Sequence, residues 1–206
     1  MSVSTIQQFL KELASSAPTP GGGSTAALSG AVGASLVSMV CQLTIGKKRY
    51  ADVQTEMHEI LKVSEELQQK LIAMIDEDAK AFDLVMDAFK MPKKTAEEKS
   101  ARRTAIQEGS KQATIVPMKV VLACARVIEL GKVVAEKGNK NALSDAGAAV
   151  LNAQAGMKTA ALNVRINLGS IKDESFVNEY RMKLDDVLAD HDTLANEIYK
   201  IVQSKL

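Results

Sequence analysis

The chain has 206 residues, with 26 basic and 25 acidic side chains and a net charge of +1. A chain of this length buries roughly 70% of the surface that its unfolded form exposes, so a core can form without disulfides. The balanced charge, with no aromatic residues interleaved among basic ones, gives no support for nucleic-acid binding. Cys41 and Cys124 lie far apart on apolar stretches, and we expect buried, reduced thiols.

The amino terminus, MSVSTIQQFLKELASS, lacks the basic start and apolar block of a signal peptide, so we expect a cytoplasmic protein. Its first helix is predicted from about Ser4 to Ala14, where Ser4 and Gln7 fit a capping box. The segment Pro18 to Gly23 contains two prolines and three consecutive glycines, which predict a sharp loop.

A second helix is predicted from Ser24 or Thr25, as its cap, to about Ile45. No charged residue occurs from Gly21 to Gly46, so a membrane span is one interpretation. The many small and polar residues, Gln42 among them, favour a buried central helix of a soluble protein instead. Small residues recur at three- and four-residue steps and would let neighbouring helices approach closely: Ala27, Gly30, Ala31, Ala34 and Ser38.

Residues Asp52 to about Lys90 predict one long helix that ends before Pro92. Thr95 and Glu98 then form a second capping box and start another helix. The apolar positions of the long helix recur every three or four residues: Leu67, Leu71, Met74, Phe82, Val85 and Phe89.

In the following helix Pro117 predicts a kink or a break, and Gly138 predicts a left-handed terminator. A second small-residue helix is predicted over 143–168, and a final amphipathic helix from about Asp173 to the end of the chain. We therefore predict an all-α, single-domain helical bundle, spanning residues 1–206, with the two small-residue helices at its centre.

The turn Gly21-Gly22-Gly23-Ser24 precedes the second helix and is the first candidate site. Free backbone N–H groups and the helix dipole at such a turn suit a carboxylate, a phosphate or the edge of a heterocycle. A tight turn followed by an N-cap explains the same residues without a ligand.

Asp78 falls within the apolar stripe of the long helix, where the pattern expects an apolar side chain. Burial raises the pKa of a carboxyl group and suits it to proton transfer near neutral pH. The alternative is an ion pair with a lysine or arginine of another helix.

Further polar residues cluster near the second small-residue helix. Asn141, Ser144 and Asp145 precede or begin it and serve either capping or binding, with capping favoured for Ser144. Asn163 and Asn167 lie one turn apart, where two amides either grip a donor–acceptor edge such as a pterin ring or bond across a helix interface.

A basic run, Lys47-Lys48-Arg49, follows the uncharged helix. It either complements the helix dipole or recognises an anionic tail. His58 and His191 stand alone on charged helices, and no cysteine or carboxylate cluster has metal-ligand spacing, so we expect no metal site.

Four blocks of the sequence, in this order, carry a resemblance: FLKELASSAPTPGGGSTAALSGAVGASLVSMVCQLTIGKKRY, DEDAKAFDLVM, VAEKGNKNALSDAGAAVL and AALNVRIN. The chain resembles the family of the cyclodeaminase half of formiminotransferase-cyclodeaminase and of stand-alone methenyltetrahydrofolate cyclohydrolases. The resemblance implies an all-helical homodimer or larger assembly that acts on a folate, with no metal, no nucleotide and no cofactor beyond tetrahydrofolate. We expect a homodimer, and from the composition we expect no nucleic-acid or membrane partner.

The resemblance also implies a set of site residues. Asp78 is the expected base and electrostatic partner, with Asp145 second and Lys47 also assigned to catalysis. Lys47 or Lys48 would bind the glutamate tail. The remaining expected substrate-binding residues are Pro20, Gly21, Gly22, Gly23, Ser24, Asn141, Ser144, Asn163 and Asn167.

The leading functional prediction is hydrolysis of 5,10-methenyltetrahydrofolate to 10-formyltetrahydrofolate. The alternative enzyme is a 5-formiminotetrahydrofolate cyclodeaminase, which releases ammonia and needs the same kinds of residues. A third hypothesis is a non-catalytic helical binding protein, which predicts an ion-paired Asp78 and a covered glycine loop.

Overall fold

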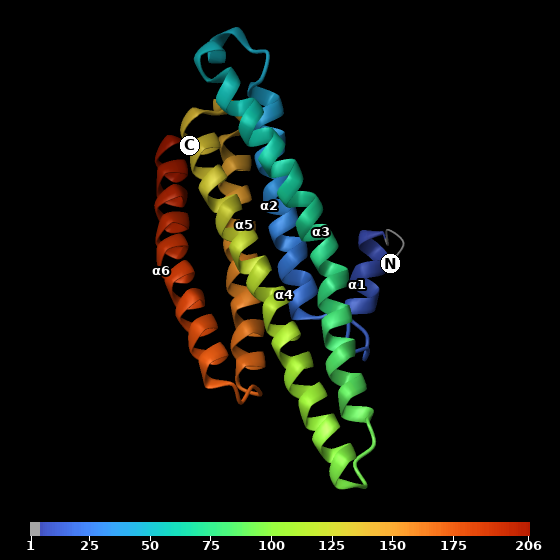
Figure 1. Cartoon of the computed structure of the whole chain (residues 1–206). Helices are drawn as coiled ribbons and strands as arrows, with labels where there is room; N and C mark the ends of the chain where they lie inside the picture. Colours follow the sequence, from blue (N-terminus) through green and yellow to red (C-terminus); the bar gives the residue numbers. More distant parts are fainter. Residues whose placement is uncertain (1–4) are drawn as a thin grey trace.

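The computed structural model describes residues 5–206, and every regular element within them is helical (Figure 1). This confirms the prediction of an all-α bundle. The elements in chain order are α1 (Ile6–Leu13), α2 (Gly22–Thr44), the 3₁₀ segment η1 (Lys48–Val53), α3 (Gln54–Lys90), α4 (Ala96–Lys137), the 3₁₀ turn η2 (Lys140–Ala142), α5 (Leu143–Leu168) and α6 (Glu174–Lys205).

The two small-residue helices, α2 and α5, pack against each other, and both also contact α4. Helix α3 covers α2 from one side and α6 covers α5 from the other, so the pair lies at the centre of the bundle (Figure 1). The α3–α4 hairpin extends beyond the lower end of the other helices in the same view. By length and composition α2 is apolar enough to cross a membrane, yet more than half of its most apolar stretch is buried inside the bundle.

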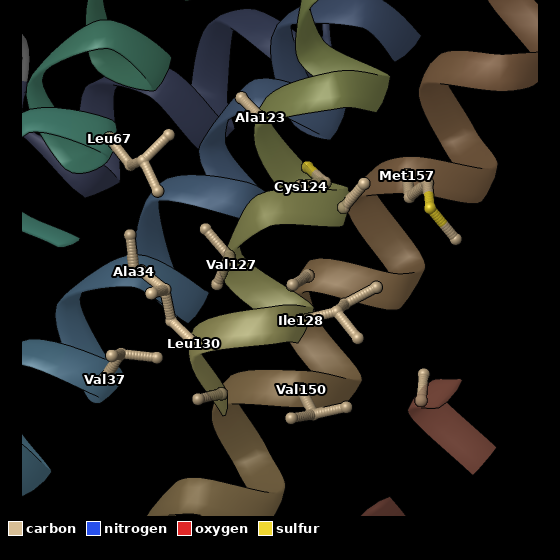
Figure 2. Packing of buried hydrophobic residues seen from close by; sticks show 14 of the residues in the cluster. Ala34, Val37, Leu67, Ala123, Cys124, Val127, Ile128, Leu130, Val150 and Met157 are labelled. Atoms are coloured by element: carbon tan, nitrogen blue, oxygen red, sulfur yellow. The ribbon is translucent and has the colours of Figure 1, made fainter. Parts of the chain in front are cut away.

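Close approach of α2 and α5 depends on glycine. A Cβ atom at Gly156 would lie 2.7 Å from the carbonyl oxygen of Ala26, and one at Gly33 would lie 2.8 Å from that of Ala149. These distances are shorter than side chains tolerate, so the small-residue pattern is a packing requirement of the central pair. The surrounding core is aliphatic, with Val127, Ile128 and the thiol of Cys124 packed between the helices (Figure 2).

Several predicted helix ends are confirmed. The second small-residue helix has the predicted bounds, and the side chain of Asp173 accepts a hydrogen bond from the Phe176 N–H at the start of α6. At the start of α4 the Glu98 N–H donates to Thr95 Oγ1 at 3.2 Å. The Thr95 N–H donates back to Glu98 Oε2 at 3.1 Å, which completes the predicted capping box.

Other predicted ends are wrong. Helix α2 begins at Gly22 with Gly21 as its N-cap, so neither Ser24 nor Thr25 caps it. At α1 the side chain of Thr5 accepts the bond from the Gln8 N–H, whereas the predicted cap, Ser4, lies outside the described residues.

In the fourth helix the predicted left-handed terminator is wrong. Of the two alternatives predicted at Pro117, the break is excluded, because α4 continues through that residue. Gly138 follows α4 as its C-cap with φ −73°, so it is not left-handed, and its N–H donates to the Val134 carbonyl. A side chain at Gly138 would overlap the Val134 carbonyl and Val40, so close packing is the reason for glycine there.

Candidate active site

A cleft of about 320 Å³ lies at the N-terminal end of α2, between that helix, α3, α4 and α5. It brings together the glycine turn, Asp78 and the two asparagines of α5, which are three of the features predicted from the sequence. The lining residues are Pro18, Thr19, Gly21, Gly22, Gly23, Asp78, Ala81, Phe82, Val85, Ala113, Asn163, Ile166 and Asn167.

Glycine at position 23 lets Asp78 approach the first turn of α2. A Cβ atom at Gly23 would lie 2.0 Å from Asp78 Oδ1 and 2.5 Å from its Cγ, which no side chain permits. A Cβ atom at Gly22 would lie 3.2 Å from Asn163 Nδ2, a tight but adjustable contact. The missing side chains of Gly22 and Gly23 therefore leave the space that the Asn163 amide and the Asp78 carboxylate occupy.

Ser24 is fully buried and hydrogen-bonds the Asp78 carboxylate. Its hydroxyl donates to Asp78 Oδ2 at 3.0 Å and lies 3.4 Å from the carbonyl oxygen of Ile75. Ser24 does not line the cleft, and neither does the buried Pro20. The structure gives Ser24 a contact with Asp78, and its contact with substrate stays a prediction.

Burial raises the pKa of the Asp78 carboxyl group above the usual aspartate range. The hydroxyl and the backbone N–H of Ser24 oppose this rise because they donate to the ionised form. Within residues 5–206 no ion pair forms with Asp78, so the structural alternative of a cross-helix salt bridge is not realised. The cleft also leaves the glycine loop uncovered, which counts against the non-catalytic hypothesis.

The two asparagines of α5 each use their amide nitrogen within the protein. Asn163 Nδ2 donates to the Thr159 carbonyl of its own helix at 2.9 Å. Asn167 Nδ2 donates across the helix interface to the Ala113 carbonyl of α4 at 2.6 Å. Each side-chain amide keeps an oxygen that can accept a hydrogen bond and a second N–H that can donate one. The two amides therefore offer both kinds of partner to a ligand beside Asp78.

The other predicted site residues lie at the opposite end of α2 and α5. Helix α2 has 23 residues and is about 34 Å long at the helical rise of ~1.5 Å per residue. The side chains of Lys47, Lys48, Asn141 and Ser144 are exposed there, and Asp145 is partly buried. A single protomer therefore does not bring these five residues into the cleft.

Capping accounts for part of this second cluster. Asn139 accepts from the Asn141 N–H at 3.0 Å and donates from its amide to the Leu43 carbonyl at 2.8 Å. Ser144 does not cap α5, because the N-cap position is occupied by Ala142 and has no side-chain bond. The basic run also lies beyond the last turn of α2, which contains no basic residue.

The histidines and thiols take no part in the cleft. His191 is not isolated, since its Nε2 lies 3.0 Å from Glu129 Oε1 and its Nδ1 lies 2.9 Å from the Val187 carbonyl. Cys41 and Cys124 are buried free thiols, and burial raises the pKa of both to about 12. Among the described residues no group of three or more His, Cys, Asp or Glu side chains is arranged to hold a metal ion.

A larger cleft of about 630 Å³ lies between α5 and α6. Its charged groups are paired: Lys158 Nζ lies 2.6 Å from Asp192 Oδ1, and Arg165 bonds Asp185 at 3.2 Å. Of these two clefts, the smaller one contains a carboxylate, Asp78, that has no counter-cation among residues 5–206, so we assign the chemistry there.

Sequence reasoning missed Ala113 as a lining residue and as the acceptor for Asn167. The available signal was Pro117, four residues later, which deprives the Ala113 carbonyl of its helical donor. The consequence of Pro117 in the structure is a hydrogen bond between helices, from Asn167 of α5 to the Ala113 carbonyl of α4, beside the cleft.

Comparison with known proteins agrees with this fold. The family model described as Formiminotransferase-cyclodeaminase matches residues 5–186. The chain belongs to this family. It is 52% identical to a methenyltetrahydrofolate cyclohydrolase of Methylorubrum extorquens, over 98% of this chain and 97% of that protein.

Two further relatives carry the cyclodeaminase name. The rat formimidoyltransferase-cyclodeaminase is 33% identical over 93% of this chain, which corresponds to 35% of the rat protein. The crystal structure of formiminotetrahydrofolate cyclodeaminase from Thermotoga maritima matches with a TM-score of 0.82 and 32% identity. That match covers 99% of this chain and 96% of the other, so the family fold extends over the whole described bundle.

Proposed function

We propose that the protein hydrolyses 5,10-methenyltetrahydrofolate to 10-formyltetrahydrofolate. The observation that carries the proposal is the Asp78 carboxylate, which faces an uncharged cleft without a counter-cation and with a raised pKa. The 52% identity to a cyclohydrolase over nearly both full lengths favours this reaction over that of the cyclodeaminase relatives at 32–33%.

The substrate suits a negatively charged wall. Its positive charge is delocalised over N5, the bridging carbon C11 and N10. Asp78, Asn163 and Asn167 line the cleft, whose lining contains no lysine or arginine. A preorganised carboxylate stabilises a cation most strongly where water is excluded.

Asp78 takes the proton as water adds to C11. The water oxygen bonds to C11 and gives a neutral tetrahedral carbon between N5 and N10. The C11–N5 bond then breaks, its electron pair stays on N5, and the proton held by Asp78 passes to N5. The oxygen remains on C11 as the formyl group of N10, the hydroxyl proton is released to solvent, and Asp78 is ionised again. Tetrahydrofolate is the only carrier that the reaction needs.

A cyclodeaminase activity is the second candidate, because the matched family and the Thermotoga structure carry that name. In that reaction N10 attacks the 5-formimino carbon, and ammonia leaves from the resulting tetrahedral carbon. The same carboxylate would take the N10 proton and return it to the leaving nitrogen. The cleft thus serves either reaction, and the assay separates them.

The test is the loss of absorbance of 5,10-methenyltetrahydrofolate in a buffer where spontaneous hydrolysis is slow. We expect a protein-dependent loss whose rate falls about a hundredfold or more in Asp78→Asn, the usual scale for removing a general base. Formation of the same chromophore with ammonia from 5-formiminotetrahydrofolate, and no hydrolysis, would assign the cyclodeaminase reaction instead. A fully active Asp78→Asn would remove Asp78 from the chemistry.

We also propose that the protein is a cytoplasmic homodimer. The outer face of α2 carries no charge and exposes large apolar side chains: Val32 at 40%, Met39 at 38% and Leu43 at 42%. An uncharged, apolar face of this kind is typical of a surface that a partner covers. Light scattering on the purified protein, with Met39→Asp as the disrupting variant, measures the assembly directly.

A dimer also gives the basic run a role in folate binding. The glutamate tail needs cations, and those of Lys47 and Lys48 lie about one helix length from the cleft of the same protomer. Their assignment to the tail therefore requires a second copy of the chain to bring its basic end to this cleft. Mixing Asp78→Asn with Lys47→Ala/Lys48→Ala restores activity if the site is shared, and leaves both defects in place if it is not.

A further inference from the structure

Pro117 occupies a buried position inside α4, where proline is costly. Its ring nitrogen carries no hydrogen, so the carbonyl four residues earlier, that of Ala113, receives no helical hydrogen bond from it. A partly buried backbone carbonyl needs a partner, because an unpaired one loses its hydration without compensation.

The partner comes from another helix, 54 positions along the chain. Asn167 Nδ2 of α5 donates to the Ala113 carbonyl at 2.6 Å, and both residues line the cleft. A flipped amide would set oxygen against oxygen at this distance, so the bond fixes which end of the amide faces the ligand. The Asn167 carbonyl oxygen is consequently held as an acceptor.

Asn163 provides the contrast on the same helix. Its amide donates to the Thr159 carbonyl, four residues earlier in α5. That carbonyl already accepts the regular helical bond from the Asn163 backbone N–H, so it does not depend on the side chain. Only the Asn167 amide is held by a carbonyl that a proline has freed.

We propose that Pro117 is a positioning residue that frees the Ala113 carbonyl to orient Asn167, whose amide oxygen then accepts a hydrogen bond from the N–H edge of the bound pterin. This assignment of the ligand edge rests on the proposed function. The hydrogen bond between Asn167 and Ala113 and its dependence on Pro117 do not.

The test of the catalytic consequence is Pro117→Ala. Alanine supplies the missing N–H to Ala113 and is a far better helix former than proline, so we expect the midpoint of thermal unfolding to rise by several degrees. The Asn167 amide loses its exclusive acceptor, and we expect KM for the folate to rise about tenfold with a smaller change in kcat. A stabilised variant with unchanged KM would overturn the proposal, as would a destabilised one.

Thermal unfolding of a double-mutant cycle tests the hydrogen bond without any substrate. Asn167→Ala lowers the unfolding midpoint in the wild-type background, where it leaves the Ala113 carbonyl unpaired, and lowers it much less in the Pro117→Ala background. Asn163→Ala, the matched control, has the same small effect in both backgrounds. An equal effect of Asn167→Ala in both would overturn the positioning role. A clear coupling in a protein that does not act on folates would instead locate the failure in the proposed function.

Discussion

At one end of α2, Gly23, Ser24 and Asp78 contact one another inside the bundle, whereas at the other end Lys47 and Lys48 extend into solvent. Both ends carry polar residues that the family resemblance assigns to the site. The first end has a fixed geometry because a missing Cβ and a buried hydroxyl place the carboxylate. The second end offers charge without fixed geometry.

This difference predicts a division of labour. Groups held by buried contacts keep the alignment that a proton transfer requires, whereas flexible exposed cations contribute mainly attraction for an anionic tail. Substitutions that move the Asp78 carboxylate should therefore change kcat, and those at the basic end should change KM.

The largest effect is expected for Gly23→Ala. Its methyl group would overlap Asp78 Oδ1, so the carboxylate must move away from the first turn of α2. A displacement of about 1 Å costs on the order of a hundredfold in rate, and kcat measured under saturating substrate reports it.

Gly21→Ala is the matched control for that variant. A Cβ at Gly21 meets only the Pro18 carbonyl, at 3.5 Å, which is ordinary contact. We expect its kcat to stay within a few-fold of wild type. Equal losses in the two variants would show that loop flexibility, and not the position of Asp78, limits the reaction.

A smaller effect is expected for Lys47→Ala/Lys48→Ala. The loss of one charge-assisted contact corresponds to about 1.5 kcal/mol, or roughly a tenfold increase in KM, while kcat remains close to wild type. Steady-state kinetics with a polyglutamylated substrate, compared with a substrate that lacks the glutamate, measures the effect. A fall in kcat with unchanged KM would place these lysines in the chemistry.

Gly156→Ala should lower the stability of the fold without directly affecting the residues at either end of α2. The methyl group would lie 2.7 Å from the Ala26 carbonyl, between the central helices, and overpacking of this kind costs about 1–3 kcal/mol. Gly109→Ala, whose Cβ would make an ordinary 3.4 Å contact with Val85, should be neutral or stabilising by up to about 1 kcal/mol. Urea unfolding of both variants reports the difference, and equal stabilities would contradict the packing account.

Much of the fold follows from local pattern. The bounds of α5 and the capping box of Thr95 and Glu98 were predictable because small-residue periodicity and cap chemistry act within a few residues. Asp78 was identified for a similar reason, since a carboxylate in an apolar stripe is a local contradiction. Its relation to the glycine run was not predictable, because that contact joins residues 54 positions apart.

The wrong predictions of a cap at Ser24 and of a break at Pro117 share one physical cause, a hydrogen bond to another helix. Ser24 is a residue type that often caps helices, but its hydroxyl bonds Asp78 on a neighbouring helix. Pro117 has the signature of a helix break, but Asn167 satisfies the carbonyl that it frees. The basic run lies far from the cleft because the 23 residues of α2 separate the two.

The pH dependence of kcat in wild type and Ser24→Ala tests the role of Asp78 as the base. A base must be ionised, so kcat should rise with pH through the pKa of Asp78, which burial places above the usual aspartate range. Removing the Ser24 hydroxyl takes away a bond that lowers this pKa, so the rise should move to higher pH, and the plateau should fall because the hydroxyl also positions the carboxylate. An unshifted profile in Ser24→Ala would contradict the assignment of Asp78, held by Ser24, as the base.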